Sequence, residues 1–462
     1  MFFLADSSRP PTTATGLDIK GLRFYSPGYF LAHNQVFLKR TVKECDYDLL
    51  NRQSKTGEGK MKPPQFDPRK KVIHDSIKAT HKKCITHELD NSGDALKHGH
   101  LDHLKNIARG LDGVVIGAGP SLENGFDTLK ECNGRALLCA ALQALPTLYA
   151  GGVKPDLVML IDQEEAHHHI FEKIPPEWLA NIPMIYLVCA HKGVVDRYPG
   201  PKIPCWTDGG VAATLFPEAF AINPEGNVAV ALTKILHFFG LNRIFFVGQD
   251  FGWTDDKSHA AGHHAADANI HHETFNIKFG EEEISGKTTT QYVAAWQSLR
   301  GYISQNKIPA FNLYGEGLPI LEAETVDHES MLTLLSDAAN EKISGFLRHL
   351  SVSKPVEGFR YKPQRKELLR DLRKDIQRME KYGLSLQGNR TRISNLMLKL
   401  RNDFRGAARK NSYIVDLMLE MEEIIKDANY DRDDIRKADR IVKEAGKRLE
   451  YFDKIVTGLG EQ

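Results

Sequence analysis

The feature that most constrains the fold is the alternation of short apolar segments with amphipathic segments between residues 110 and 325. Each apolar segment is rich in Val, Ile, Leu and Phe and ends at a Gly, an Asp or a polar cluster. Continuous apolar strands that alternate with helices indicate a mostly parallel sheet with helices on both faces, which is a Rossmann-like α/β fold. The expected strands are GVVIGA (113–118), RALLCAA (135–141), DLVMLID (156–162), PMIYLVC (183–189) and RIFFVGQD (243–250).

The position of a ligand site follows from this fold class. In parallel sheets of this kind, ligands bind at the carboxyl ends of the strands, near the point at which the strand order reverses. Polar residues that directly follow a strand are therefore the candidate site residues.

The N-terminal flank, residues 1–105, is irregular in pattern. It holds two short aromatic-rich strand candidates, GLRFYS (21–26) and YFLAHNQVFL (29–38). The Lys- and Pro-rich stretch 54–71 between them and the central region predicts a loop. We expect an accessory region that packs on a neighbouring part of the chain.

The C-terminal flank has a helical pattern from residue 331 to residue 462. SYIVDLMLEMEEII (412–425) and DDIRKADRIVKEAGKRLEYFDKIV (433–456) continue the period seen in ELLRDLRKDIQRME (367–380), where apolar residues recur at three- and four-residue steps. The apolar face of that segment is Leu369, Leu372, Ile376 and Met379. The expected division is an N-terminal accessory region 1–105, a central α/β domain 106–330 and a C-terminal helical bundle 331–462.

Composition excludes several functional classes. The net charge is +1, with 61 Lys and Arg against 60 Asp and Glu, so no overall field attracts nucleic acid or a membrane surface. The 6 cysteines form no CxxC pair, which indicates reduced thiols rather than a disulfide framework or a zinc site. The N-terminus lacks the leading positive charge of a secretory signal, and no run of about 18 apolar residues predicts a membrane span. We expect a cytoplasmic protein.

The turn after the first expected strand, GAGPS, departs from a dinucleotide fingerprint, because Pro120 and Ser121 stand where a third glycine would be. Gly119 lets the backbone approach a ligand closely, and Ser121 is placed to cap the following helix, so free N–H groups and a hydroxyl could bind an anion. A tight turn with an ordinary cap explains the same residues equally well. The candidate anion-binding residues are Gly117, Gly119, Pro120 and Ser121.

Two further strand ends carry polar residues. Asp162 ends the third expected strand and could accept hydrogen bonds from sugar hydroxyls; the alternative is a helix N-cap or a partner for a lysine. Gln249 and Asp250 follow RIFFV directly and begin a long loop, and long loops at strand ends usually have a function.

That loop contains His259, His263 and His264. A general base or a phosphate contact is the preferred interpretation, and zinc the weaker one, because no Cys or HExxH-like acid accompanies them. The runs 167–169 and 271–272 are interpreted as solvated polar histidines.

A second helix start is expected at Gly226 and Asn227, with Asn227 as N-cap. Ordinary capping explains Asn227 alone. Two helix N-termini at one cleft would suit a ligand that carries phosphate and carboxylate groups.

Taken in order, GAGPSLE, GGVKPDLVMLID and EGNVAVALTKILHFFGLNRIFFVGQDFGWTDDKSHAAG resemble one family over residues 106–325. It is the motility accessory factor (Maf) family of bacterial flagellin glycosyltransferases, which transfer nonulosonic acids such as pseudaminic or legionaminic acid. The shared domain is also similar to the archaeal 6-hydroxymethylpterin pyrophosphokinase domain, and the GxGPS turn resembles that of bacterial CMP-sialic acid transferases.

The resemblance implies a metal-independent, CMP-sugar-dependent glycosyltransferase with no tightly bound cofactor and with flagellin as protein partner. It places the CMP-sugar against Gly117, Gly119, Pro120 and Ser121, with Asp162, Gly226, Asn227 and Gln249 lining the same cleft. It implies His259 as the base that deprotonates the acceptor hydroxyl, with Asp250, His263 and His264 as rivals. On this basis Ser121→Ala is expected to weaken CMP binding.

Two alternatives remain open at this point. One is a pterin pyrophosphokinase-like enzyme that uses ATP and magnesium. The other is a non-catalytic adaptor that binds flagellin. Residues 360–410 contain sixteen Lys or Arg against five Asp or Glu, which is typical of a solvated helical surface and would also fit an acidic protein partner.

Overall fold

The computed structural model describes residues 68–462 except for several short segments. Nothing in residues 1–67 is therefore assigned, and the two expected N-terminal strands lie outside the described residues. The apolar face predicted for residues 367–380 and the histidines at 264, 271 and 272 also lie outside the described residues. The segments left out within 68–462 are 209–218, 255, 264–272, 280–281, 314–316, 338, 353–369, 372, 376, 379, 382–389, 411–413, 426–429, 431 and 461–462.

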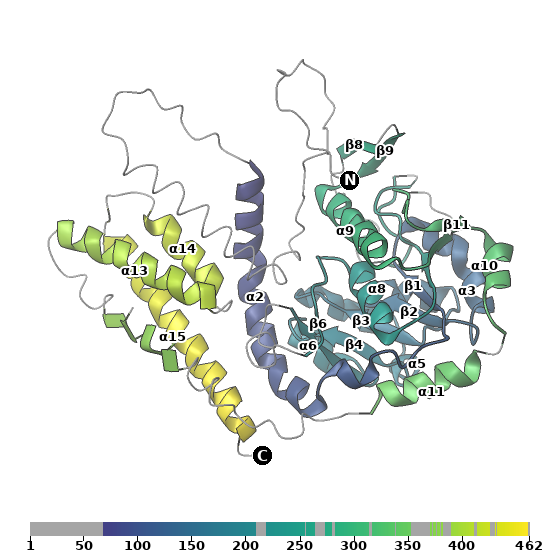
Figure 1. Cartoon of the computed structure of the whole chain (residues 1–462), viewed down its shortest axis with the longest axis horizontal. Helices are drawn as coiled ribbons and strands as arrows, with labels where there is room; N and C mark the ends of the chain where they lie inside the picture. The colour runs from purple at the N-terminus through teal and green to yellow at the C-terminus, as the bar shows by residue number, and fades with distance from the viewer. Residues whose placement is uncertain are drawn as a thin grey trace, which may run out of the picture.

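The larger part of the molecule, on the right in Figure 1, is built on a nine-stranded sheet in which every strand pair is parallel. The strand order is β11-β10-β7-β1-β2-β3-β4-β5-β6. This confirms the predicted α/β fold with a mostly parallel sheet. The strands are β1 Gly113–Ile116, β2 Leu137–Ala141, β3 Leu157–Leu160, β4 Met184–Leu187, β5 Lys202–Thr207, β6 Ala221–Ile222, β7 Ile244–Val247, β10 Ala310–Leu313 and β11 Glu324–Val326.

Helices cover both faces of the sheet, as expected. Alternate residues of β1 point to opposite faces: Val115 belongs to one core, and Val114 and Ile116 belong to another. The first core is closed by α8 (Val228–Phe239), α9 (Thr290–Asn306) and α11 (Asn340–Leu350), and the second by α3 (Phe126–Glu131) and α10 (His328–Leu334). Farther along the sheet, α5 (Pro176–Leu179) and α6 (Lys192–Arg197) cover β3 and β4 on the side of the second core.

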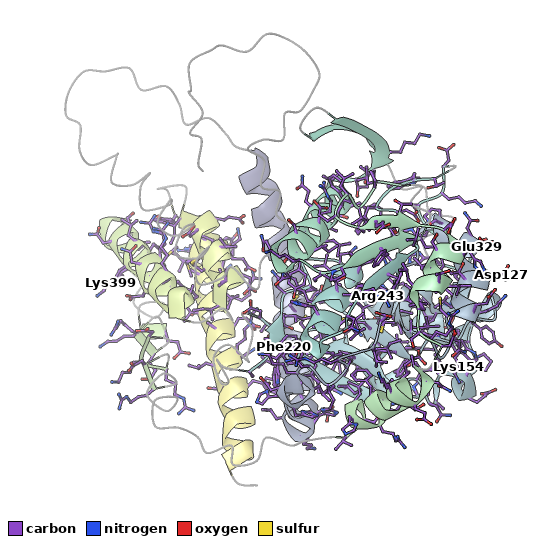
Figure 2. All side chains as sticks on the ribbon, turned by 45° about the vertical axis from the view of Figure 1, so that its right-hand side comes forward. Asp127, Lys154, Phe220, Arg243, Glu329 and Lys399 are labelled. Atoms are coloured by element: carbon purple, nitrogen blue, oxygen red, sulfur yellow. The ribbon has the colours of Figure 1, made fainter. Side chains whose placement is uncertain are left out.

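The strand order reverses between β1 and β7. From β1 the chain proceeds outward through β2 to β6, and it then returns to place β7 on the other side of β1. At the amino ends of these two strands, Arg243 (Figure 2) and Asp112 form a two-pronged ion pair of 2.9 and 2.8 Å. This pair fixes the two strands at the edge opposite the switch point. A two-stranded antiparallel hairpin, β8 (Glu273–Phe279) and β9 (Glu282–Thr288), then leads into α9.

The C-terminal helices share a core with a helix from the N-terminal flank. The helices α13 (Arg390–Lys410), α14 (Val415–Ile425) and α15 (Arg432–Gly460) pack with α2 (Pro68–His98). Their common core contains Leu89, Phe404, Met418, Val442 and the sheet residue Trp206. In Figure 1, α2 accordingly stands between these helices and the sheet.

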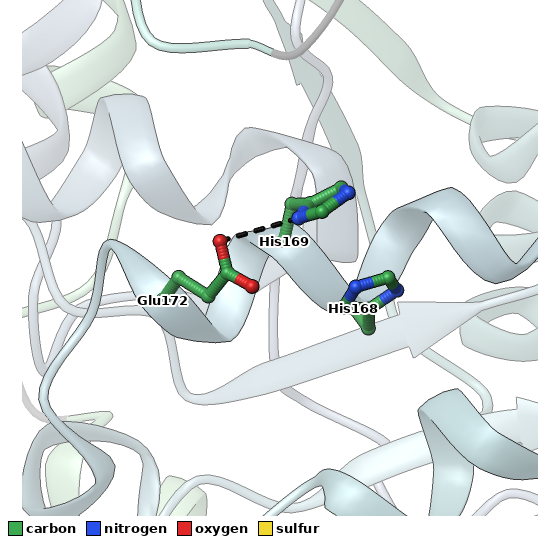
Figure 3. Close-up of side chains that lie close together, drawn as sticks. All are labelled: His168, His169 and Glu172. Atoms are coloured by element: carbon green, nitrogen blue, oxygen red, sulfur yellow. Dashed lines mark hydrogen bonds and ion pairs between the residues drawn. The ribbon is translucent and has the colours of Figure 1, made fainter.

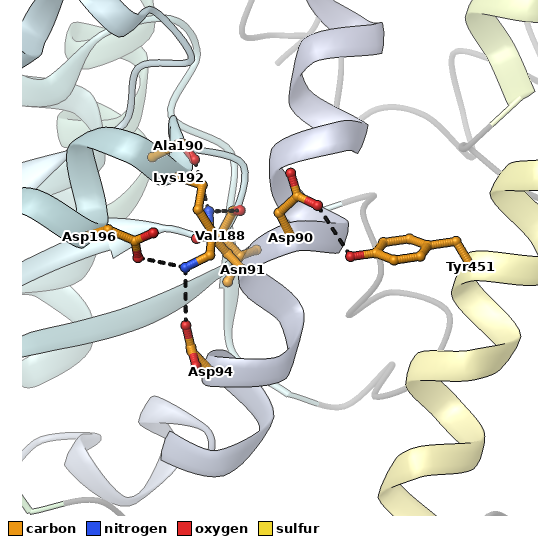
Figure 4. Close-up of polar contacts among 8 residues, drawn as sticks. All are labelled: Asp90, Asn91, Asp94, Val188, Ala190, Lys192, Asp196 and Tyr451. Carbon is orange, nitrogen blue, oxygen red and sulfur yellow. Dashed lines mark hydrogen bonds and ion pairs between the residues drawn. The ribbon is translucent and has the colours of Figure 1, made fainter.

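Polar contacts tie α2 to both of its neighbours (Figure 4). The fully buried amide of Asn91 donates to the carbonyls of Val188 and Ala190, just after β4, at 2.9 and 2.8 Å. On the other side, the Tyr451 hydroxyl of α15 lies 3.2 Å from a carboxylate oxygen of Asp90. The helix is therefore part of the sheet's cover and part of the helical group at the same time.

The five strands predicted between residues 113 and 250 are all present, and six of the strands that the structure describes were missed. The missed strands are β5, β6, β10 and β11 of the sheet and the hairpin strands β8 and β9. The stretch 54–71 was expected to be a loop, but its last four residues begin α2, where the missing N–H of Pro68 costs nothing. The predicted helices at 412–425 and 433–456 correspond to α14 and α15.

Two further expectations concern cysteines and membranes. Five cysteines in the described part of the chain are free and buried, as expected of reduced thiols. Among the helices that the structure describes, we find none with the length and apolar character needed to cross a bilayer.

Candidate active site

A cavity of about 330 Å³ opens at the carboxyl edge of the sheet, at the switch point between β1 and β7. The residues after β1, β2, β3 and β7 line it together with the first residues of α8 and α9. Eight of the predicted site residues meet there: Gly117, Gly119, Asp162, Gly226, Asn227, Gln249, Asp250 and His259. Pro120 and Ser121 are not among the residues that line the cavity.

The two glycines of GAGPS allow the loops after β1 and β7 to touch. The N–H of Gly117 donates to Val247 O at 2.9 Å, and the N–H of Gly119 donates to Gly248 O at 3.0 Å. A Cβ on Gly117 would collide with Gln249 and Gly248, and a Cβ on Gly119 would collide with the Asp250 carboxylate and with Gly248. The glycines are thus required by the contact between the loops, whatever ligand the cavity holds.

Ser121 does not cap the following helix as predicted. A 3₁₀ helix, η3 (Pro120–Gly125), begins directly after Gly119, which is its N-cap, and the short α3 follows it. The buried N–H of Ser121 donates to Asp250 Oδ2 at 3.0 Å. The anion on this turn is therefore a carboxylate of the protein itself, from a residue 129 positions later in the chain.

Asn227 is the N-cap of α8, as predicted. Its side-chain oxygen accepts the N–H of Ala229 at 2.8 Å and that of Val230 at 3.4 Å. The turn before it has positive φ angles at Glu225 (51°) and Gly226 (72°), and such a backbone favours glycine. The N–H groups of Ala229 and Val230 are thus satisfied within the helix start, and Asn227 still lines the cavity.

Asp162 lies at the end of β3 beside two residues that sequence reasoning missed. Its Oδ2 accepts a hydrogen bond from Gln143 Nε2 at 3.1 Å and lies 3.8 Å from His167 Nε2. Burial raises the pKa of Asp162, against the opposing effect of His167, and Glu164 raises it further. Gln143, two residues past β2, satisfies the rule that polar residues after a strand are candidates, so this signal was present.

His167 corrects a second expectation. It was interpreted as solvated, but it is 4% exposed. Its Nε2 is 2.7 Å from Gln143 Nε2 and its Nδ1 is 3.2 Å from Glu164 O. The run of three histidines therefore has one member facing the site. The sequence could not show which histidine of this run is buried, because that depends on how the 3₁₀ helix η5 (Glu165–Glu172) turns its side chains.

His259 is held by two hydroxyl groups. Its Nδ1 is 2.9 Å from Ser258 Oγ, and its Nε2 is 3.0 Å from the Tyr292 hydroxyl. The ring stacks on that of His263, with 3.8 Å between centroids. Burial raises the pKa of Tyr292 to about 12. Tyr292, in the first turn of α9, lines the cavity and was missed because it is more than 30 residues away from the histidine loop.

The loop that carries His259 is pinned against the GAGPS turn. The N–H of Ala260 donates to Ala118 O at 3.0 Å, and the N–H of Ala261 donates to Glu123 Oε1 at 2.8 Å. The Thr147 hydroxyl donates to Ala261 O at 2.6 Å. Because these contacts involve three separate elements, the position of His259 is defined by the fold and not by the loop sequence alone.

The charged side chains of the cavity are acidic. Asp162 and Asp250 line it, and the lining that the structure describes contains no Lys or Arg. The remaining polar groups are amides, hydroxyls, one imidazole and backbone. Such a set provides hydrogen-bond donors from Gln249 and oxygen ligands for a hard cation, whereas the Gln143 amide already donates to Asp162.

Comparisons with known proteins fit this geometry. Residues 86–256 match the family model described as 6-hydroxymethylpterin diphosphokinase MptE-like. A protein of Treponema pallidum (strain Nichols), described as uncharacterized, is 32% identical over 71 residues, which is 15% of this chain and 34% of that protein. The chain thus matches about a third of the length of this relative.

The fold is similar to that of a Maf glycosyltransferase from Magnetospirillum magneticum AMB-1. The TM-score is 0.55 and the sequence identity 16%, and the superposition covers 85% of this chain and 67% of that chain. The resemblance drawn from the ordered motifs is thereby confirmed, both to the fold of the Maf protein and to the pterin-kinase-like domain.

Proposed function

We propose that the protein is a glycosyltransferase that moves a CMP-activated nonulosonic acid, of the pseudaminic or legionaminic type, onto Ser or Thr of flagellin in the cytoplasm, a step needed for flagellum assembly and motility. The observation that carries the proposal is the cavity of about 330 Å³ at the switch point of a fold similar to a Maf glycosyltransferase. Ligands of parallel α/β sheets bind at this edge, and the volume suits a ligand of nucleotide size.

The donor in this proposal lies across the loops after β1 and β7. The backbone at Gly117 and Gly119 comes close to it, and the side-chain amide of Gln249 donates hydrogen bonds to its phosphate or carboxylate. Asp162 accepts hydrogen bonds from its hydroxyls. The N–H groups of Ser121, Ala229 and Val230 already donate to Asp250 and Asn227, so in this proposal the side-chain amide of Gln249 binds the phosphate in their place.

The reaction needs one base. The acceptor oxygen forms a bond to the anomeric carbon, the bond between that carbon and the phosphate oxygen breaks, and CMP leaves with the electron pair. The proton of the acceptor hydroxyl goes to Nε2 of His259. In the tautomer that donates from Nδ1 to Ser258, Nε2 carries a lone pair, which accepts a hydrogen bond from Tyr292 in the free protein. In this proposal the acceptor hydroxyl displaces that hydrogen bond before Nε2 takes its proton. Tyr292 is neutral at physiological pH, as a tyrosine normally is, and burial raises its pKa further to about 12. It orients the ring.

The test is transfer to flagellin by the purified chain. We expect CMP-pseudaminic or CMP-legionaminic acid to add the mass of one sugar to flagellin, and CMP to raise the melting temperature. His259→Ala should keep the shift with CMP and lose transfer. His349→Ala is the control, because His349 is an exposed histidine on α11. Normal transfer by His259→Ala would exclude it as the base and favour Asp250. Flagellin of unchanged mass in a deletion strain would contradict the proposed function.

A second candidate is a pterin pyrophosphokinase-like enzyme that uses ATP and magnesium. It is favoured by the family model that matches residues 86–256 and by the two carboxylates of an acidic cavity. Asp162 and Asp250 would hold Mg²⁺, which prefers oxygen ligands, and the ion would neutralise the charge of the triphosphate. A melting-temperature rise with ATP, Mg²⁺ and pterin, but none with CMP or CDP, would favour this function. No rise with any nucleotide would favour a flagellin-binding adaptor.

A further inference from the structure

The 3₁₀ helix η5 carries a second group of side chains outside the cavity. Its buried His167 faces Gln143 and Asp162, whereas His168, His169 and Glu172 lie together on its outer side (Figure 3). The proposed function uses none of these three residues.

The three side chains present ligand atoms to one another. One atom from each residue lies within 4.8 Å of the other two, and in the part of the chain that the structure describes this is the one group of three or more such side chains. His169 Nδ1 is 3.2 Å from Glu172 Oε2, and the two imidazole rings are 4.0 Å apart between centroids. His169 and Glu172 are more than half exposed, so small side-chain rotations can bring the atoms to the roughly 2.0–2.2 Å of metal–ligand bonds.

The hydrogen bond of His168 leaves its Nε2 available to bind a metal. Its Nδ1 is 2.7 Å from Glu165 O. A carbonyl accepts, so Nδ1 carries the proton and Nε2 keeps its lone pair. A second-shell contact from one ring nitrogen to a backbone carbonyl is the usual way in which a ligating histidine is oriented.

We propose that His168, His169 and Glu172 bind a divalent transition-metal ion of the zinc class. Two imidazole nitrogens and one carboxylate oxygen suit Zn²⁺, Ni²⁺ or Cu²⁺, whereas Mg²⁺ and Ca²⁺ prefer oxygen ligands alone. Water completes the coordination, because the site is open to solvent.

The position of the site gives it a structural consequence. The same short helix contacts Asp162 through His167 and Gln143, and Lys173 at its end donates to Gly262 O of the histidine loop at 3.2 Å. A metal bound across positions 168–172 fixes the turn of η5, which stands between these two parts of the cavity wall.

The experiment is zinc titration into the full chain, prepared without a polyhistidine tag and freed of metal by chelator dialysis. Isothermal titration calorimetry should give one saturable Zn²⁺ site, and Zn²⁺ but not Mg²⁺ should raise the melting temperature. His169→Ala and Glu172→Gln should each weaken zinc binding by about tenfold or more. Both positions are exposed, so the variants should fold normally, which circular dichroism verifies.

His349→Ala is the matched control. His349 is exposed, and its Nδ1 contacts Gly345 O at 2.8 Å, much as His168 contacts Glu165, but Gly345 and the rest of that turn add no second ligand. The His349→Ala variant should bind zinc with the same affinity as the unmodified chain. Absence of a saturable site, or zinc affinity in His169→Ala within less than tenfold of the unmodified chain, would overturn the proposal and place any binding elsewhere.

Discussion

Two turns at the cavity were each expected to begin a capped helix. In both, an oxygen of the protein caps the backbone N–H groups, but the capping residue comes from a different place in the chain. At the start of α8 the amide groups are capped by Asn227, their immediate neighbour. At the GAGPS turn the amide of Ser121 is capped by Asp250, 129 residues away. Both turns satisfy their own amides with an oxygen of the protein, but the first is a local motif and the second joins two strand ends.

The difference teaches what each turn contributes. A local cap stabilises one helix, and losing it costs about 1 kcal/mol. A cap supplied across the switch point also fixes the separation of β1 and β7 and the direction of the Asp250 carboxylate in the cavity. The GAGPS turn should therefore be more sensitive to substitution than the Asn227 turn.

The largest effect is expected for Gly119→Ala. The new Cβ would collide with the Asp250 carboxylate and with Gly248 O, so the loops must separate, and we expect a loss of about 3 kcal/mol in the free energy of unfolding. Urea denaturation measures it. Gly345→Ala is the control, because nothing lies within 4 Å of a Cβ there. Equal stability of both variants would show that the two loops do not need their close contact.

Asp250→Ala should have the next largest effect. It leaves the buried N–H of Ser121 without this acceptor, which costs about 2 kcal/mol, and the exchange of the Ser121 amide with deuterium should become faster. Asp250→Asn keeps an oxygen acceptor and should recover most of the protection. If Asp250→Ala leaves the exchange rate unchanged, the cap across the switch point is not formed in solution.

Asn227→Ala should cost about 1 kcal/mol, because only the local cap of α8 is lost. Asn227→Ser keeps a capping oxygen and should cost less than Asn227→Ala. Unfolding in urea compares both with the unmodified chain. A loss greater than that of Asp250→Ala would reverse the ranking of the two turns.

The smallest effect is expected for Ser121→Ala, within about 0.5 kcal/mol of the unmodified chain. The contact to Asp250 uses the main-chain N–H, which alanine keeps, and the residue does not line the cavity. The affinity for CMP, measured by calorimetry, should also stay the same. Weaker CMP binding would restore the role for the hydroxyl that the sequence suggested.

A feature could be predicted from the sequence when neighbouring residues determine it. The strands GVVI and IFFV could be predicted because they are buried on both faces and therefore continuously apolar. The two-residue β6 and the three-residue β11 are too short to produce a pattern. Asn227 was correctly identified as a cap because its partners are the next residues.

The site residues that were missed have non-local causes. The contacts of His167 with Gln143 and of His259 with Tyr292 join segments that meet only in the folded chain. The predicted capping role of Ser121 was wrong for the same reason, since the partner of its N–H, Asp250, comes from the loop after β7. Sequence patterns predicted three of the four strand ends that line the cavity, those of β1, β3 and β7. They did not predict which hydrogen bonds the protein makes with itself there.

The core that α2 shares with the C-terminal helices has a consequence for the timing of synthesis. Tyr451 and Asp90 are 361 positions apart, so at ribosomal speeds α2 emerges roughly 20 to 70 s before its partner helix. During that interval the helix can already dock on the strand end through Asn91, but one apolar side has nothing to cover it. A nascent chain that stalls before α15 therefore exposes an apolar face of α2 to which chaperones can bind.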